Sequence, residues 1–278
     1  MTIIEPHIHM YSRTTDDYQA MYAAGIRACV EPSFWLGANR RYAGTFLDYF
    51  LLILEFETVR ARRFGIDHYS TISVNPKEAE DLGIVREVLA GMPEYLDHPR
   101  CVGLGEIGFN NITPNEEGAF IEQLHMGNDR KMPIIVHTPH VDKRRGTQRI
   151  IEIIEAEGVD RERIIIDHNT EETLAMSLAT GCWCDMTVYP ISKLSPERVS
   201  KMIHEFGSDR LIVNGSADWG VSDPLSLVKV AEYMAGDGHD AATIQKLVFN
   251  HAMAFYAASP NWKPELDIKP MDVREFQR

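Results

Sequence analysis

The chain has no apolar run long enough to cross a membrane and no recognisable leader segment. Its longest apolar run, residues 49–54, is stopped by Glu55, whereas a transmembrane helix needs about 20 apolar residues. The N-terminus lacks a basic stretch followed by an apolar one, so it does not resemble a secretory signal. We therefore expect a cytoplasmic protein with no membrane partner.

Cysteine is scarce, and its spacing excludes paired zinc knuckles. The 278 residues include four cysteines, and all of them lie in apolar, strand-like segments. We expect buried, reduced thiols, because a free cysteine usually behaves as a small core residue. The four residues are Cys29, Cys101, Cys182 and Cys184.

Positive charge is also scarce, with 28 Lys and Arg against 41 Asp and Glu and a net charge of −13. This balance argues against a broad basic surface for duplex nucleic acid, although a local basic patch is compatible with it. We expect a small-molecule substrate rather than a nucleic acid as partner. The oligomeric state stays open.

Neither a long internal repeat nor a low-complexity tract is present, and short β-rich runs alternate with helical patterns from end to end. This alternation is typical of parallel βαβ units, and eight of them predict an α/β (β/α)8 TIM barrel. The apolar spacing of the intervening segments predicts helices over 116–130, 147–157, 171–178, 196–206 and 224–234. The predicted strands are residues 3–9, 26–31, 68–74, 101–106, 133–137, 163–168, 182–186 and 211–216.

Two segments depart from the regular alternation. Residues 34–63 are longer than an ordinary crossover and predict an insertion after strand 2, over one end of the barrel, before a helix begins. Residues 240–257 predict one extra C-terminal helix, and residues 261–278 read as a polar tail. We predict a single barrel domain over residues 1–260, followed by the tail over residues 261–278.

The first predicted strand ends in a His-x-His pair, His7 and His9. Because side chains alternate along a strand, both imidazoles are expected on the same side, where they can grip one ion. Two histidines at this spacing are packed or surface residues at least as often as metal ligands. Their place at the end of a barrel strand is what favours the metal interpretation.

Three further candidates, Glu106, His137 and His168, each end a predicted strand at intervals of about 31 residues, the length of one βα unit. Asp218 follows the eighth predicted strand. These side chains are therefore expected to converge with the His-x-His pair at the C-terminal rim, where this fold carries its active sites. Each residue taken alone is equally well explained as a core or surface residue, but the whole set is not.

Imidazole nitrogens and carboxylate oxygens are donors that hold zinc, manganese or iron, and the two oxygens of Glu106 can bridge two ions. The set predicts two divalent metal ions, zinc first, with manganese, iron or magnesium as alternatives. Such a pair activates water for hydrolysis at neutral pH. We expect Glu106 and Asp218 to be catalytic, with Asp218 binding one ion and carrying a proton.

The ligand order and the surrounding motifs resemble the TatD-like metal-dependent hydrolases of the amidohydrolase superfamily over nearly the whole chain. The resemblance implies hydrolysis by metal-bound water, with Glu106 bridging the ions. It places His7, His9 and Asp218 at one ion and His137 and His168 at the other. Branches that bridge with a carboxylated lysine differ, since no lysine ends the fourth predicted strand. The matching motifs are His7-Ile8-His9, Gly105-Glu106-Ile107-Gly108, His137, His168 and Asp218.

Two departures from the nuclease members of that family bear on the substrate. Those members follow the bridging glutamate with Gly-Leu-Asp-Tyr, where this chain has Gly108-Phe109-Asn110-Asn111. They carry Glu-Thr-Asp-Ala-Pro at the last ligand, where this chain has Gly215-Ser216-Ala217-Asp218-Trp219. A divergent TatD-related branch is a better match. We expect a small phosphoester, amide or lactone as substrate; a TatD-type exodeoxyribonuclease and a non-catalytic metal-binding subunit of a complex are the alternatives.

Several neighbours of the predicted ligands are candidate substrate residues. His140 follows His137 by three residues, Asn169 adjoins His168, and Trp219 adjoins Asp218. The basic run at residues 143–145 either attracts a phosphate or begins the next helix. For the remaining histidines, His204 and His239 among them, we expect no ligand role because they fall away from the predicted rim.

Overall fold

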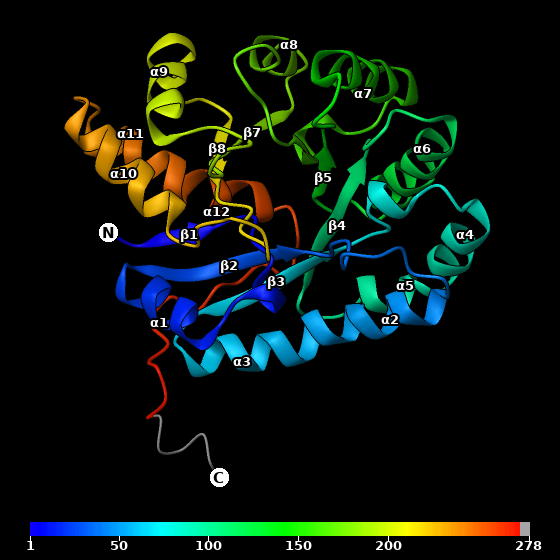
Figure 1. Ribbon diagram of the computed structural model, residues 1–278, viewed down its shortest axis with the longest axis horizontal. Coiled ribbons are helices and arrows are strands. Elements are labelled where there is room, and N and C mark those ends of the chain that lie inside the picture. The colour runs from blue at the N-terminus through cyan, green and yellow to red at the C-terminus, as the bar shows by residue number, and fades with distance from the viewer. Residues whose placement is uncertain (273–278) are drawn as a thin grey trace.

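The computed structural model describes residues 1–272, and its centre is a sheet of eight parallel strands. Strands that are neighbours in the sheet are successive in the sequence, and helices return along the outside (Figure 1). The sheet curls into a nearly closed (β/α)8 barrel, which confirms the predicted fold. The strands are β1 (Ile3–Glu5), β2 (Ile26–Pro32), β3 (Asp67–Ile72), β4 (Cys101–Gly108), β5 (Ile134–His137), β6 (Ile164–Ile166), β7 (Trp183–Thr187) and β8 (Leu211–Asn214).

Helices of very different length follow the strands. Three short 3-10 turns occur as well, at Met10–Ser12, Pro76–Glu78 and Arg161–Arg163. The helices are α1 (Thr15–Ala23), α2 (Ala43–Leu51), α3 (Glu57–Arg63), α4 (Leu82–Gly91), α5 (Pro93–Leu96), α6 (Pro114–Asp129), α7 (Lys143–Glu157), α8 (Leu174–Leu178), α9 (Pro196–Phe206), α10 (Ser226–Gly236), α11 (Ala241–Gln245) and α12 (His251–Tyr256).

Both predicted departures from the regular alternation are confirmed. Residues 33–42 contain no helix or strand, and a π-helical turn at Leu52–Phe56 then joins α2 to α3 in one continuous rod along the barrel (Figure 1). A second π-helical turn at Lys246–Asn250 joins α11 to α12 in the extra C-terminal helix.

The predicted tail lies only partly within the described residues. Trp262 and Ile268 in it are buried, and residues 273–278 lie outside the described part of the chain. The division of the chain at residue 260 stays a prediction. None of the helices in residues 1–272 combines the length and the apolar character that a membrane crossing requires.

Apolar side chains fill the barrel and the space beneath its helices. Inside the barrel, Ile4, Val30 and Ile212 belong to one buried cluster, against which Phe255 and Tyr256 of α12 pack. The hydroxyl of Tyr256 donates a hydrogen bond to the carbonyl of Pro6 at 2.8 Å. The four cysteines are free and buried, as predicted.

The barrel is closed at its rim by the loops that follow the first and last strands. The backbone N–H of Ser216 donates to the carbonyl of His7 at 2.8 Å, and that of His9 donates to Ala217 at 2.9 Å. These two bonds hold the His-x-His segment against the loop that leads to Asp218. The register of the candidate ligands therefore depends directly on barrel closure.

Five predicted strand ends are wrong by two residues or more, and local backbone chemistry explains two of them; β3 and β8 each end two residues earlier than predicted, at Ile72 and Asn214. β1 ends at Glu5 because Pro6 has no N–H to continue the ladder. β6 ends at Ile166, and His168 adopts a φ of 57°, which an extended strand does not allow. β4 runs two residues beyond Glu106, to Gly108. His137 does end its strand, as predicted.

A buried carboxylate holds the loop after β4 in place. Glu116, in the first turn of α6, accepts backbone N–H bonds from Asn110, Asn111 and Ile112 at 2.8 to 3.1 Å. Thr113 and Glu116 also form a reciprocal capping box at the start of the helix. The loop that follows the Glu106 strand is therefore anchored by one side chain.

We expect Glu116→Ala to lower the free energy of unfolding by about 3 kcal/mol, because three partly buried backbone N–H donors of the loop lose their carboxylate acceptor. Glu117→Ala is the matched control, since its partly exposed ion pair with Arg149 is expected to contribute less than about 1 kcal/mol. Urea unfolding followed by circular dichroism measures both values. Equal losses in the two variants would contradict the anchoring role.

Candidate metal centre

A pocket of about 130 Å³ lies at the C-terminal ends of the strands. Histidines, carboxylates and two lysines line it, so its chemistry is polar and dense in groups that bind cations and anions. The residues that line it are Phe34, Lys77, Glu106, His137, His140, His168, Tyr189, Ser192, Lys193, Ser216 and Asp218.

Glu106 lies at the centre of the candidate site and is buried. Its Oε1 is 3.1 Å from His137 Nδ1, 3.3 Å from His168 Nε2 and 3.4 Å from His7 Nε2. Its Oε2 accepts a hydrogen bond from the amide of Asn75 at 3.1 Å. One carboxylate is therefore shared by imidazoles from three different βα units.

The candidate ligands form two groups that share Glu106. The ligand atoms of His7, His9 and Glu106 lie within 4.8 Å of one another, and so do those of Glu106, His137 and His168. The structure thus brings together five of the six residues that the sequence singled out, in the grouping that the family resemblance implies.

The tautomer of His9 tests whether these residues suit a metal. His9 Nδ1 donates to the carbonyl of Pro32 at 3.2 Å, which leaves Nε2 as a lone-pair acceptor. That Nε2 is buried with no hydrogen-bond partner, and the Nε2 of His7 is buried with only the ion-pair contact to Glu106 at 3.4 Å. Buried nitrogens of this kind are costly unless something binds them. A divalent cation satisfies both, so the donor set fits a metal.

Asp167 is a buried residue of this site that the sequence analysis missed. Its Oδ2 is 2.7 Å from His7 Nδ1, and its Oδ1 accepts the backbone N–H of His168 at 2.6 Å. Burial opposes ionisation, but the charges of His168 and His7 hold the pKa of Asp167 well below its usual range. A carboxylate behind a ligating imidazole fixes its ring and tautomer. The available signal was its position directly before His168.

The loop that follows His137 and the loop that carries His168 are tied together by Lys143. Its Nζ donates to the Thr138 hydroxyl at 2.9 Å and to the His168 carbonyl at 3.0 Å. Burial lowers the pKa of Lys143 to about 8. Of the two interpretations of the basic run, the structure favours the second for Lys143. This residue begins α7, and its ammonium group supports the site from behind.

Asp218 lines the pocket but lies outside both groups of converging ligand atoms. Its Oδ1 accepts hydrogen bonds from the Tyr189 hydroxyl and from the Gly220 N–H, both at 2.7 Å. Burial and the contact with Asp218 raise the pKa of Tyr189, so its hydroxyl stays a donor. The structure therefore places Asp218 at the wall of the same pocket, outside the two groups whose ligand atoms lie within 4.8 Å of one another, and its role as a metal ligand stays a prediction.

Two lysines that the sequence analysis did not single out face the pocket. Lys193, in the loop after β7, has its Nζ 3.1 Å from His168 Nδ1 and 3.4 Å from Ser216 Oγ. Burial lowers the pKa of Lys193, while the carboxylates of Asp167 and Glu106 oppose that shift. Lys77 lies 4.5 Å from the ring centroid of Trp35. Lys193 sits in a loop and Lys77 in the short 3-10 turn at Pro76–Glu78, where periodicity carries no signal.

The three predicted substrate residues have different surroundings. His140 lines the pocket at its rim. Trp219 is half-exposed and packs behind Phe34, with 5.1 Å between ring centroids, while Phe34 itself stacks on His9. Asn169 does not line the pocket, and the geometry gives its predicted substrate role no support. Its amide donates to the Ile166 carbonyl at 2.7 Å, so it holds the loop after β6.

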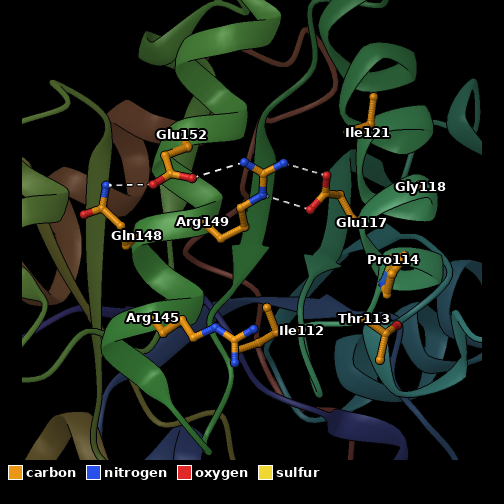
Figure 2. Close-up of a pocket in the computed structure, with 10 residues that line it drawn as sticks. All are labelled: Ile112, Thr113, Pro114, Glu117, Gly118, Ile121, Arg145, Gln148, Arg149 and Glu152. Carbon is orange, nitrogen blue, oxygen red and sulfur yellow. Dashed lines mark hydrogen bonds and ion pairs between the residues drawn. The ribbon is translucent and has the colours of Figure 1, made fainter.

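A larger hollow of about 570 Å³ lies outside the barrel between α6 and α7 (Figure 2). Arg149 crosses it and is paired with Glu117 on one side and Glu152 on the other. Its lining residues include no histidine, and its charges are already paired. The candidate ligands predicted from the sequence therefore belong to the smaller pocket at the rim and not to this hollow.

A parallel (β/α)8 barrel with clustered imidazoles and carboxylates at its C-terminal rim fits the class of metal-dependent hydrolases. The model of the family described as TatD-related DNase matches residues 5–220, and the chain belongs to this family. It is 26% identical over 262 residues to an uncharacterised metal-dependent hydrolase of Methanocaldococcus jannaschii, covering 91% of this chain and 99% of that protein.

Solved structures agree with the fold. The TatD-like protein of Archaeoglobus fulgidus has a TM-score of 0.76 at 24% identity, covering 91% of this chain and 99% of that one. The phosphotriesterase of Mycobacterium tuberculosis has a TM-score of 0.65 at 14% identity, covering 92% and 93%. The family match, together with these similarities, confirms the predicted TatD-like barrel and identifies the protein as a metal-dependent hydrolase.

The contact between Asp167 and His7 leads to a prediction about metal affinity. We expect Asp167→Asn to weaken the binding of divalent ions about 10- to 100-fold, because the His7 ring loses the charge that orients it. Competition with a chromophoric chelator measures the affinity. Asp160→Asn, at an exposed cap of the turn at Arg161–Arg163, is the matched control and should bind as wild type does. Wild-type affinity in Asp167→Asn would show that His7 needs no supporting carboxylate.

Proposed function

We propose that this metal-dependent hydrolase cleaves a small, negatively charged substrate, with a phosphoester preferred among the phosphoester, amide and lactone that the sequence suggests. The observation that carries the proposal is the placement of Lys193 and Lys77 in the pocket that contains Glu106. Ammonium groups beside a cation site favour a substrate with excess negative charge. The pocket of about 130 Å³ suits the charged head of a small molecule.

In this proposal the two groups of ligands hold two divalent ions. His7 and His9 hold one ion, His137 and His168 hold the other, and Glu106 is shared. Zinc is preferred for so many imidazoles, with manganese, iron and magnesium as alternatives. When bound, such ions lower the pKa of water and polarise the scissile group.

The remaining pocket residues have separate tasks. Tyr189 and Gly220 donate to Oδ1 of Asp218, so they orient the carboxylate for proton transfer between water and the leaving group. The Lys193 ammonium is placed to stabilise negative charge that develops on the substrate. Phe34 covers His9 with its ring and limits the access of bulk water.

A single-strand exonuclease is the second candidate, and one observation favours it. His140 lines both the rim pocket and a neighbouring hollow, which is also lined by Lys143, Arg144 and Arg145. A basic path of this kind suits a nucleic-acid backbone leaving the site. The name of the matched family points the same way. Membership of a hydrolase family argues against the third alternative, a non-catalytic metal-binding subunit.

A substrate panel separates these functions. It contains p-nitrophenyl phosphate, bis-p-nitrophenyl phosphate, an aryl lactone, an anilide and a labelled single-stranded oligonucleotide, each assayed with zinc, manganese, iron and magnesium. We expect turnover of a small phosphoester that a chelator abolishes and added metal restores. Preferential trimming of the oligonucleotide would replace the proposal with the nuclease, and preferential cleavage of the lactone or anilide would replace it with that chemistry.

We expect Lys193→Met to lower kcat/KM on the phosphoester about 100- to 1,000-fold, the usual effect of removing one group that stabilises transition-state charge. Its metal content should stay at the wild-type level. Lys201→Met is the matched control, because Lys201 is an exposed residue of α9 paired with Glu197. A variant that loses metal rather than turnover would show that Lys193 supports the ligands instead.

For Asp218→Asn we expect turnover to be abolished while most of the metal stays bound, since the carboxylate carries the proton and lies outside the two ligand groups. Steady-state kinetics and elemental analysis of the same preparation give both readouts. Wild-type activity in this variant would remove the proton-transfer role.

A further inference from the structure

Two histidines and a carboxylate converge on the outside of the barrel, between α9 and the turn that follows α10. The ligand atoms of His204, Asp237 and His239 lie within 4.8 Å of one another. The two imidazole rings are stacked, with 4.0 Å between their centroids and 24° between their planes. His204 Nε2 is 3.2 Å from Asp237 Oδ2.

This cluster is separate from the rim. In a βα unit the helix runs antiparallel to its strand. The C-terminus of each helix therefore lies at the bottom of the barrel, opposite the face that carries the active site. His204 is in the last turn of α9, and Asp237 directly follows α10. The cluster therefore shares no residue and no end of the barrel with the hydrolase pocket.

The backbone presents these side chains whether or not a ligand is bound. The N–H of Asp237 donates to the Tyr233 carbonyl at 2.9 Å, and the N–H of His239 donates to the Met234 carbonyl at 3.0 Å. Gly238, with a φ of 90°, supplies the left-handed residue that such a helix end requires. The turn is thus held by α10 itself.

Ser200 completes the arrangement from α9, one turn before His204, on the same face of the helix. Its hydroxyl donates to Asp237 Oδ2 at 2.6 Å, and its Oγ lies 2.9 Å from His239 Nε2. The bond from Ser200 lowers the pKa of Asp237, so the carboxylate is ionised at neutral pH. One negative charge and two imidazole nitrogens then face the same small region.

Two imidazoles and one carboxylate are three ligands of the kind that zinc accepts, with a water in the fourth position. A partly buried pair elsewhere on the barrel shows what distinguishes the cluster. His125 Nε2 is 2.7 Å from Glu157 Oε2, but within residues 1–272 no third ligand atom lies within 4.8 Å of both.

We propose that His204, Asp237 and His239 form a second metal site, which binds a divalent transition ion, Zn²⁺ by preference, and links α9 to the turn after α10. The site is independent of the hydrolytic centre. It adds one ion per chain to those at the rim, and once zinc exceeds the dissociation constant the stabilisation of the fold grows with the logarithm of the free zinc concentration.

The test compares metal content after equilibrium dialysis against Zn²⁺, measured by elemental analysis. We expect His204→Ala and His239→Ala each to bind one ion fewer per chain than wild type, with unchanged kcat and KM at the rim. His125→Ala is the matched control and should bind the wild-type number. Wild-type metal content in both cluster variants would overturn the proposal.

A second readout uses the unaltered protein and so does not depend on how the variants fold. Diethyl pyrocarbonate modifies free imidazole nitrogens, and peptide mass spectrometry locates the products. We expect Zn²⁺ to protect His204 and His239 and to leave the modification of His125 unchanged. If each of the three histidines is modified to the same extent with Zn²⁺ as without it, the cluster is only a hydrogen-bond network between two helices.

Discussion

The candidate active site depends on one buried anion, the carboxylate of Glu106. Burial opposes its ionisation, yet the charges of His7 and His137 hold the pKa of Glu106 well below its usual range. A charge in this position is stable only when cations and hydrogen-bond donors surround it. Its imidazole neighbours come from the first, fifth and sixth βα units. The need to surround this one buried carboxylate therefore brings distant parts of the chain together at Glu106.

The residues around Glu106 support this carboxylate and the histidines next to it. Asn75 binds the second oxygen of Glu106, Asp167 lies behind His7, and Pro32 orients His9. The bonds that close the barrel at Ser216 and Ala217 are made to the His-x-His segment itself. Local conformations that regular structure avoids, such as the positive φ of His168, occur here because hydrogen bonds on both sides hold them.

The sequence predicted the barrel and the convergence of the ligands because both depend on regular repeats. The spacing between Glu106, His137 and His168 follows from the length of a βα unit, and the structure brings the three together as that spacing requires. Strand ends were less predictable, because Pro6 and the left-handed His168 end their strands for reasons that hydrophobic patterning does not reflect.

Residues in loops were the hardest to find. Lys193, Tyr189 and Asp167 reach the site through loop conformations that leave no periodic signal. The surface cluster was missed for a related reason: His204 and His239 are far from the rim, and their approach depends on how α9 packs against the end of α10. A histidine far from the predicted rim does not belong to the metal centre at that rim, but its distance says little about whether it belongs to a separate metal site.

The central claim is that Glu106 joins two groups of ligands into one metal centre. Anomalous diffraction from crystals grown with zinc or manganese tests it most directly, because it locates ions rather than counting them. The account predicts anomalous peaks within bonding distance of Glu106 on both sides, one beside His7 and His9 and one beside His137 and His168. Crystals that diffract well and show no peak at Glu106 with either metal would contradict it.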